Sequence, residues 1–231
     1  MRITHLRILS AIALASITMA KAQGTFQNLN FEEANIVPIA GSPYYPYAIT
    51  VANALPGWTV DYGSAQQTQI LYNDPSLGDT AVTLYANGYP GSPVPVIDGN
   101  FSVLLQGGLL NGVTTAASIS QTGLIPSGTQ SLLFDVGSPT FPPSPPQVSI
   151  GNQELSLFPV GSVGNYTIFG GNISEWAGQT EQLTFSSSFQ NFLIDDISFS
   201  TQAVPEPSPL ALTGVGGLLF ALYRRLAPKR K

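Results

Sequence analysis

The chain has 231 residues, which suit one domain with targeting segments, and 9% of them are charged, against about 25% in an ordinary soluble domain. All Lys and Arg residues and the one His lie at residues 1–21 or 224–231, and cysteine is absent. Residues 22–223 therefore cannot neutralise phosphates, which excludes nucleic-acid binding. Disulfides, His or Cys metal sites, Ser-His-Asp triads and Cys or Lys nucleophiles are excluded there too.

Residues 1–22 have the three-part pattern of a secretory signal peptide. Arg2 and Arg7 form a positive n-region, residues 8–19 are the apolar h-region, and Ala20 and Ala22 are the small residues that a signal peptidase requires. The apolar run is shorter than the ~20 residues of a membrane span. We therefore expect export through the Sec machinery and cleavage by signal peptidase after Ala22.

Residues 23–203 predict an all-β domain. Short runs rich in Val, Ile, Thr, Phe and Tyr alternate with Gly, Pro, Asn and Ser, and no apolar pattern of helical period reaches ten residues. The predicted strands include residues 25–31, 57–61, 80–85, 101–106, 117–121, 130–136, 147–150, 154–158, 166–169, 182–186 and 192–200. Many short strands bounded by turn residues indicate a single β-sandwich or jelly roll.

The last predicted strand, residues 192–200, alternates between two faces. Positions 192, 194, 196, 198 and 200 fall on one side, and positions 193, 195, 197 and 199 on the other. Leu193 and Ile194 are adjacent and both apolar, so the sequence does not decide which of the two points into the core.

Two Pro-rich stretches predict loops. Residues 40–47 (AGSPYYPY) contain two prolines, and residues 138–146 (SPTFPPSPP) contain five, which exclude a central strand. The second stretch is either a linker between two domains or an internal loop. We prefer the loop, because the residues that follow it are too few for a good sandwich.

Aromatic residues are the first candidates for ligand binding, because sugar rings stack on exposed aromatic faces. Tyr44, Tyr45 and Tyr47 lie in the first Pro-rich loop and are the predicted ligand-binding residues. Packing over the edge of the sandwich is the alternative for all three. Trp58 and Trp176 each flank a predicted strand, and we expect both in the core.

Five short motifs occur in order along the predicted domain. They are NLNFE at 28–32, LPGW at 55–58, SISQT at 118–122, SLLFD at 131–135 and IDDIS at 194–198. The series resembles the galactose-binding-like jelly rolls, which include many carbohydrate-binding modules. The resemblance implies that the first and last strands of the domain lie side by side.

The same resemblance implies a structural calcium ion held by an early Glu and a late Asp. The matching residues are Glu32 and Asp196, with Glu33 and Asp195 as substitutes under another strand phase. Ca²⁺ takes six to eight oxygen ligands, many of them carboxylate or carbonyl oxygens. The alternative is that these carboxylates cap strands or accept backbone N–H bonds.

The last segment, residues 204–231, has three elements in sequence. Val204, Pro205, Glu206 and Pro207 form a short motif, and an apolar stretch follows at residues 210–223. The basic residues that close the chain are Arg224, Arg225, Lys229, Arg230 and Lys231.

This arrangement resembles the PEP-CTERM sorting signal of Gram-negative bacteria. The resemblance implies a transmembrane helix that anchors the protein transiently in the inner membrane, with the basic tail in the cytoplasm. It also implies processing by an exosortase near the Pro-Glu-Pro motif. The mature protein is then expected at the cell surface or outside the cell, and a plain C-terminal membrane anchor is the alternative.

Three functions remain open for residues 23–203, which carry twelve acidic residues and no basic one. We favour an exported, non-catalytic cell-surface or extracellular-matrix protein with a structural or adhesive role. The alternative is a carbohydrate-binding module for extracellular polysaccharide. A glycoside hydrolase that uses only carboxyl groups is the third. No pair of acids stands out, so we expect no enzyme activity.

Overall fold

The computed structural model describes residues 24–204, apart from residues 45, 75, 77, 90–94 and 138–144. The predicted signal peptide and residues 205–231 of the predicted sorting signal lie outside the described residues. Within the described part, no helix is long and apolar enough to cross a membrane.

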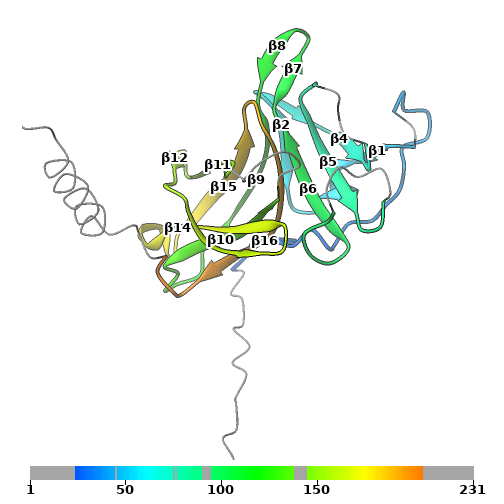
Figure 1. Cartoon of the computed structure of the whole chain (residues 1–231). Coiled ribbons are helices and arrows are strands. Elements are labelled where there is room, and N and C mark those ends of the chain that lie inside the picture. The colour runs from blue at the N-terminus through cyan, green and yellow to red at the C-terminus, as the bar shows by residue number, and fades with distance from the viewer. Residues whose placement is uncertain are drawn as a thin grey trace, which may run out of the picture.

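Two β-sheets face each other and form a sandwich, which confirms the predicted all-β class (Figure 1). The larger sheet has eight strands, in the spatial order β1 (Ala48–Thr50), β4 (Gln69–Tyr72), β5 (Ala81–Ala86), β6 (Phe101–Gln106), β16 (Asn191–Ser200), β10 (Ser131–Gly137), β14 (Tyr166–Asn172) and β13 (Phe158–Val163). Neighbours in it are antiparallel except for the parallel pair β4–β5.

The smaller sheet has six strands, in the order β12 (Gln153–Glu154), β11 (Gln147–Ile150), β15 (Thr180–Ser187), β9 (Ala117–Leu124), β2 (Thr59–Tyr62) and β3 (Ala65–Gln67). A separate hairpin, β7 (Gly108–Leu110) and β8 (Val113–Thr115), projects beyond the sheets (Figure 1). The described helices are single turns, α1 (Val51–Ala54) and η1 (Ser174–Trp176). Strands from both sides of the Pro-rich residues 138–146 pair within each sheet, as an internal loop requires.

Most predicted strands coincide with observed ones, and the disagreements have local causes. Residues 25–31 form no strand, because Asn28 and Phe31 have φ of 49° and 58° and break the extended chain. The predicted strand at residues 154–158 overlaps observed strands only at its two end residues, Glu154 in β12 and Phe158 in β13. Among the unpredicted strands, β1, β3 and β4 have three or four residues each, and tertiary pairing rather than local pattern determines them.

The irregular residues 25–31 nevertheless lie beside the last strand, as the jelly-roll resemblance implies. The Ile197 N–H donates to the Leu29 carbonyl at 3.0 Å. The Phe26 and Phe199 rings have centroids 5.1 Å apart. The first segment of the domain is therefore a strap across β16 rather than a strand of its own.

A β-bulge in β16 changes which residues of that strand face the core. Asp195 is opposite Asp135 and Ser198 is opposite Leu133, so β16 carries one extra residue in this interval. Asp196, with φ of 50°, lies at this irregularity. Ile194 and Ile197 therefore both join the core, and the strict alternation predicted for residues 192–200 is wrong after Asp195.

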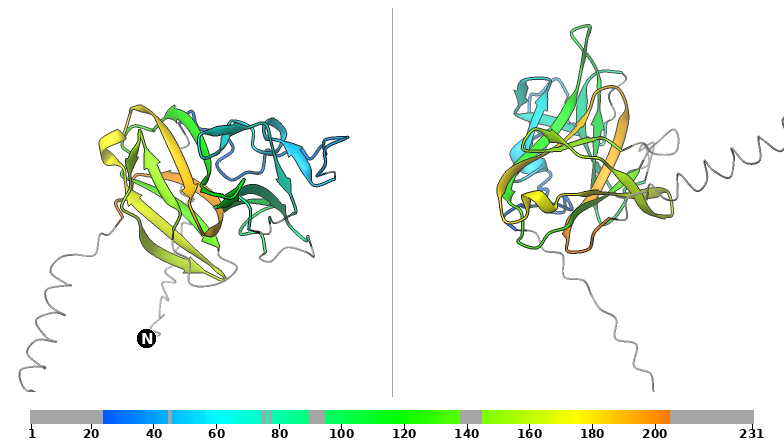
Figure 2. Two further views of the ribbon diagram at one scale, coloured as in Figure 1. Left: turned by 90° about the horizontal axis from the view of Figure 1, so that it is seen from above. Right: turned by 90° about the vertical axis from the view of Figure 1, so that its left-hand side faces the viewer.

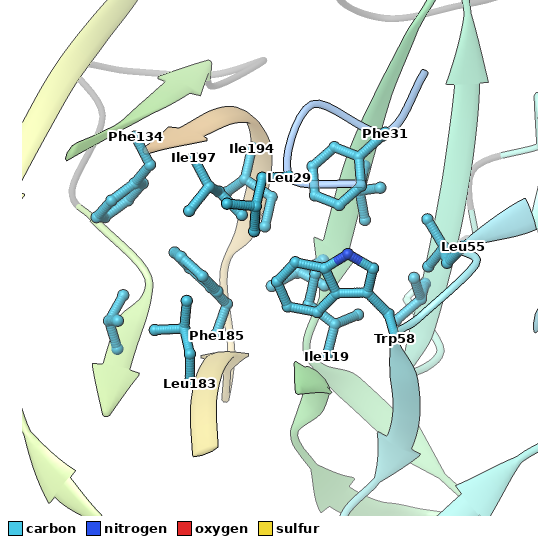
Figure 3. Packing of buried hydrophobic residues seen from close by; sticks show 14 of the residues in the cluster. Leu29, Phe31, Leu55, Trp58, Ile119, Phe134, Leu183, Phe185, Ile194 and Ile197 are labelled. Carbon is cyan, nitrogen blue, oxygen red and sulfur yellow. The ribbon is translucent and has the colours of Figure 1, made fainter. Parts of the chain in front are cut away.

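The core between the sheets contains a continuous series of aromatic contacts (Figure 3). The Phe134 and Phe185 rings are T-shaped with centroids 5.1 Å apart, Phe185 meets Trp58 at 6.3 Å, and Trp58 meets Phe31 at 5.9 Å. Such pairs contribute about 0.5–1.5 kcal/mol each beyond the area they bury. Because they join both sheets and the N-terminal strap, they connect the three parts of the sandwich.

Trp58 confirms its predicted place in the core. It is 5% exposed, and its indole N–H donates to the Asn28 carbonyl at 3.1 Å. The same carbonyl accepts the Phe31 N–H at 3.3 Å, which closes the turn of the strap. Trp58 therefore holds the strap by packing and by a buried hydrogen bond.

Replacing this residue tests the core directly. Trp58→Ala should lower the free energy of unfolding by about 3–5 kcal/mol, because it opens a cavity and removes the bond to Asn28. The matched control is Phe189→Ala, since Phe189 is 73% exposed, and its effect should stay within about 0.5 kcal/mol. Urea unfolding of the full chain measures both. A loss below about 1 kcal/mol for Trp58→Ala would contradict its role in the core.

Candidate functional site

The main candidate site is a groove at one edge of the sandwich, which we call the tyrosine groove. It has a volume of about 800 Å³, within the range of small-molecule sites. Strands β1, β4 and β5 of the larger sheet, β2 and β3 of the smaller sheet and the β7–β8 hairpin surround it. The aromatic and polar side chains that line it include those of Tyr44, Tyr62, Gln67, Gln69, Asp74 and Asp79.

Two tyrosines supply the aromatic part of the groove. Tyr44 is 55% exposed, and a tight turn holds it, since the Tyr47 N–H donates to the Tyr44 carbonyl at 2.6 Å. Tyr62 is half-buried, and its hydroxyl accepts the Val82 N–H at 3.0 Å. This bond joins the two sheets at the groove, so the Tyr62 ring has a fixed position.

Tyr44 and Tyr62 line the same groove, and the environment there raises the pKa of Tyr62. Burial raises the pKa of Tyr62, the hydrogen bond from Val82 opposes the rise, and the nearby Tyr44 phenol adds to it. The Tyr62 hydroxyl therefore stays protonated at neutral pH and can donate as well as accept hydrogen bonds.

Hydrogen bonds hold the β4–β5 connection, which brings acidic and hydroxyl groups to the groove. The Thr83 hydroxyl donates to the Asp74 carbonyl at 3.1 Å, and the Gln106 amide donates to the Ser76 carbonyl at 2.6 Å. The Asp79 N–H donates to the Ser76 hydroxyl at 3.0 Å. These bonds hold the backbone at Asp74, Ser76 and Asp79, which lowers the entropy cost of binding through the two groove carboxylates.

The β7–β8 hairpin forms one wall of the groove. It is bound at its base, where the Thr80 N–H donates to the Leu109 carbonyl and the Leu109 N–H to the Gly78 carbonyl, each at 3.0 Å. Its tip is Asn111-Gly112, with φ of 52° and 79°, the conformation of a type I′ turn. An Asn-Gly pair between apolar residues is a strong hairpin signal, and it could have predicted this wall.

Of the three predicted binding tyrosines, the structure brings Tyr44 into the groove. Tyr47 is 42% exposed and does not line it, and Tyr45 lies outside the described residues. Tyr62 and the polar groove residues were not predicted. They come from short strands and from the β4–β5 connection, and strands far apart in the sequence bring them together.

The predicted calcium residue Glu32 binds N–H groups instead of standing free. Its Oε1 accepts the backbone N–H groups of Asn100 and Phe101 at 2.7 and 2.9 Å, and its Oε2 accepts the Asn100 side-chain amide at 2.8 Å. Gly99, with φ of 60°, leaves room for this carboxylate, since an added Cβ would lie 2.5 Å from Oε1. The alternative that Glu32 accepts backbone N–H bonds is confirmed.

The other predicted calcium residue, Asp196, lies in an acidic group on the outer face of the larger sheet. Asp135 of β10 is opposite Asp195 of β16, next to Asp196. Burial, and then the charges of Asp135, Asp98, Asp196 and Asp195 in that order, raise the pKa of Tyr166. Among the described residues, no three or more His, Cys, Asp or Glu side chains are arranged to hold a metal ion. The calcium ion therefore stays a prediction from the sequence.

Asp195, the predicted substitute for Asp196, is a buried carboxyl group held by neutral donors. It is 1% exposed, and its Oδ2 accepts the Ser102 hydroxyl at 2.6 Å while its Oδ1 accepts the Asp196 N–H at 2.7 Å. Burial raises the pKa of Asp195 to about 7, although the hydrogen bonds from Ser102, Asp196 and Asp98 oppose the rise. Asp195 therefore titrates near neutral pH.

This titration predicts a pH dependence of stability. The folded state holds the Asp195 proton more tightly than the unfolded chain, where the pKa is near its ordinary 3.8. The resulting stabilisation is complete below about pH 4 and is lost as the pH rises through about 7. Asp195→Asn should remove about 4 kcal/mol of this decline, which corresponds to the shift of its pKa from 3.8 to about 7. Chemical unfolding between pH 4 and 8 measures it. The exposed Asp98→Asn is the control, and an unchanged decline in Asp195→Asn would contradict the assignment.

Comparisons with known proteins identify no family. No protein-family model matches the chain, and no curated protein matches it. Several solved structures are distantly similar, including the following two. The enzymatically active domain of bacteriophage CBA120 tailspike protein 4 matches 77% of this chain at 12% identity, with a TM-score of 0.37. The structure of TmCBM61 in complex with β-1,4-galactotriose matches 78% of this chain at 15% identity, with a TM-score of 0.34.

The two matches differ in extent. The match covers 21% of the tailspike chain and 100% of the TmCBM61 chain. This chain therefore spans about a fifth of the tailspike chain. Because both TM-scores are below 0.5, the similarity carries no conclusion about ligand or activity, and the functional argument rests on the groove.

Proposed function

We propose that residues 23–203 form a non-catalytic module that binds a neutral saccharide in the tyrosine groove. The observation that carries the proposal is the composition of this groove. It combines two tyrosines with amide, carboxylate and hydroxyl groups in an open site of about 800 Å³. Sugars present apolar C–H faces that pack on aromatic rings and hydroxyls that bind such polar groups.

The absence of cations narrows the ligand class. The sequence has no Lys, Arg or His between residues 22 and 223, and Asp74 and Asp79 line the groove. An anionic polysaccharide would bring negative charge against these carboxylates without any compensating cation. Neutral saccharides carry no such cost, and their hydroxyls can donate to the carboxylates.

The binding proposal makes a residue-level prediction. Tyr44→Ala should weaken the binding of a neutral oligosaccharide about tenfold or more, because it removes the exposed aromatic face of the groove. Calorimetric titration of the full chain with glucose, galactose, mannose and xylose tetrasaccharides measures this. Stability should not change, since the Tyr44 side chain is 55% exposed.

Tyr47→Ala is the matched control, because it removes a neighbouring exposed tyrosine that does not line the groove. It should bind with unchanged affinity. Equal losses in both variants, or no binding of any panel sugar by the unaltered chain, would overturn the proposal. Release of reducing sugar would instead favour the carboxyl-only glycoside hydrolase.

We further propose that the module acts at the cell surface, after sorting through residues 204–231. The support is the sequence, where the Pro-Glu-Pro motif, an apolar stretch and a basic end follow one another. A structural or adhesive role fits this location, since a surface protein that binds saccharide can attach to extracellular polysaccharide.

Deletion of residues 210–231 tests the sorting proposal. The shortened protein should appear in a different cell fraction from the full chain, because it lacks the apolar and basic parts of the signal. Fractionation of the producing bacterium with immunoblotting measures this. Glu206→Ala is the matched point variant for the motif. An unchanged distribution after the deletion would overturn the sorting proposal.

A further inference from the structure

A second groove lies at the other edge of the sandwich, and we call it the tryptophan groove. It has a volume of about 400 Å³. Strand β12 of the smaller sheet, β13 and β14 of the larger sheet and the turn η1 surround it. The aromatic and polar side chains that line it include those of Gln153, Glu154, Phe158, Asn172, Glu175 and Trp176.

Trp176 and Phe158 are the aromatic residues of this groove. Both are half-buried, so each ring packs on the protein and still keeps an accessible part. The sequence predicts Trp176 in the core, and the structure places it at the border, in contact with the core and in the groove wall.

Hydrogen bonds order the polar residues around Trp176. The Asn172 Oδ1 accepts the N–H and the hydroxyl of Ser174 at 3.0 and 2.8 Å, which holds the start of η1. The Gln153 amide donates to the Glu175 Oε1 at 3.1 Å and so joins β12 to η1. Ile173 is fully buried and anchors the turn from below. Contacts between β12, β14 and η1 therefore determine the positions of the residues that line the groove.

The chemistry of the tryptophan groove matches that of the tyrosine groove. Each has two aromatic side chains and two carboxylates, with three side-chain amides in the tyrosine groove and two in the tryptophan groove. Neither contains a cation, since the sequence has none between residues 22 and 223. The tryptophan groove therefore suits a neutral saccharide for the same chemical reasons as the tyrosine groove.

The topology places the two grooves at opposite edges of both sheets. In the larger sheet, β1 and β4 lie at one edge and β14 and β13 at the other; in the smaller sheet, β2 and β3 lie opposite β12. Seven spacings of about 4.8 Å across the eight strands separate these edges by roughly 34 Å. The left view of Figure 2 shows this separation, with η1 and β14 in yellow at one end and β1 and β3 in blue and cyan at the other.

We infer that one copy of the protein binds two separate saccharide chains, one in each groove, and thereby crosslinks polysaccharide. This inference rests on the proposed function and adds a second site and its consequence. Because the grooves are at opposite edges of one sandwich, a short oligosaccharide cannot reach both. A polymer with many repeats can occupy grooves on several copies and so form a network.

The stoichiometry of binding tests the second site. The full chain is titrated by calorimetry with the tetrasaccharide from the neutral panel that it binds. We expect two sites per chain, and one site in Trp176→Ala and in Tyr44→Ala. Because Trp176 also contacts the core, Glu154→Ala is the second variant, since this exposed residue of β12 can be removed without unfolding the sandwich. It should weaken one of the two sites about tenfold. Phe189→Ala, outside both grooves, should keep both sites.

Light scattering with the corresponding polysaccharide tests the crosslinking. The unaltered chain should raise the scattering most at an intermediate ratio of protein to polymer. Trp176→Ala and Tyr44→Ala should bind the polymer without this maximum. Sedimentation of the sugar-free protein must show a monomer, because a dimer with one site per copy would crosslink as well.

The outcomes separate the two proposals. One site per chain, removed by Tyr44→Ala and kept in Trp176→Ala and Glu154→Ala, overturns the second site and leaves the proposed function standing. One site removed by Trp176→Ala instead overturns both the tyrosine groove and the crosslinking. No binding of any neutral panel sugar overturns the proposed function and this inference together.

Discussion

The constraint on which this structure depends is the absence of any basic side chain between residues 22 and 223. No side-chain ion pair can form in the described part of the chain, and cysteine is absent as well. Every carboxylate that folding removes from water must therefore be stabilised by neutral donors. Glu32 and Asp195 show the two results. Glu32 accepts three N–H bonds near the surface and fixes the start of β6. Asp195 also accepts three hydrogen bonds, but it is buried, and this burial raises its pKa to about 7.

Stability must then come from apolar packing and backbone hydrogen bonds. The aromatic contacts from Phe134 through Phe185 and Trp58 to Phe31 connect both sheets to the N-terminal strap. The strap needs this support, because it contributes no strand to either sheet. The bulge at Asp196 serves the same contact, since it turns Ile197 toward the core and its N–H toward Leu29.

The same constraint links the fold to the proposed ligand. The sandwich is open at both edges, and at each edge a connecting segment and a short strand of each sheet enclose a groove. In each groove a hydrogen bond joins two separate elements, β5 to β2 through Val82 and Tyr62 at one edge and β12 to η1 through Gln153 and Glu175 at the other. With aromatic and acidic walls and no cation, such grooves suit neutral polyhydroxyl ligands and disfavour anions. A rigid sandwich keeps the two sites apart, which is the geometry that crosslinking needs.

The sequence by itself determined the all-β class, most of the long strands, the place of Trp58 and the chemical classes that a chain without cations excludes. These features depend on composition or on patterns within a few residues, so they are local. It could not determine the short edge strands, the phase change in β16 or the grooves. The sequence pointed to Tyr44 through its exposed loop, but Tyr62, Gln67 and Asp79 join it only because β2, β3 and the β4–β5 connection meet in space. Only the tertiary structure decided these features, because strand pairing and sheet closure bring together residues that no local pattern relates.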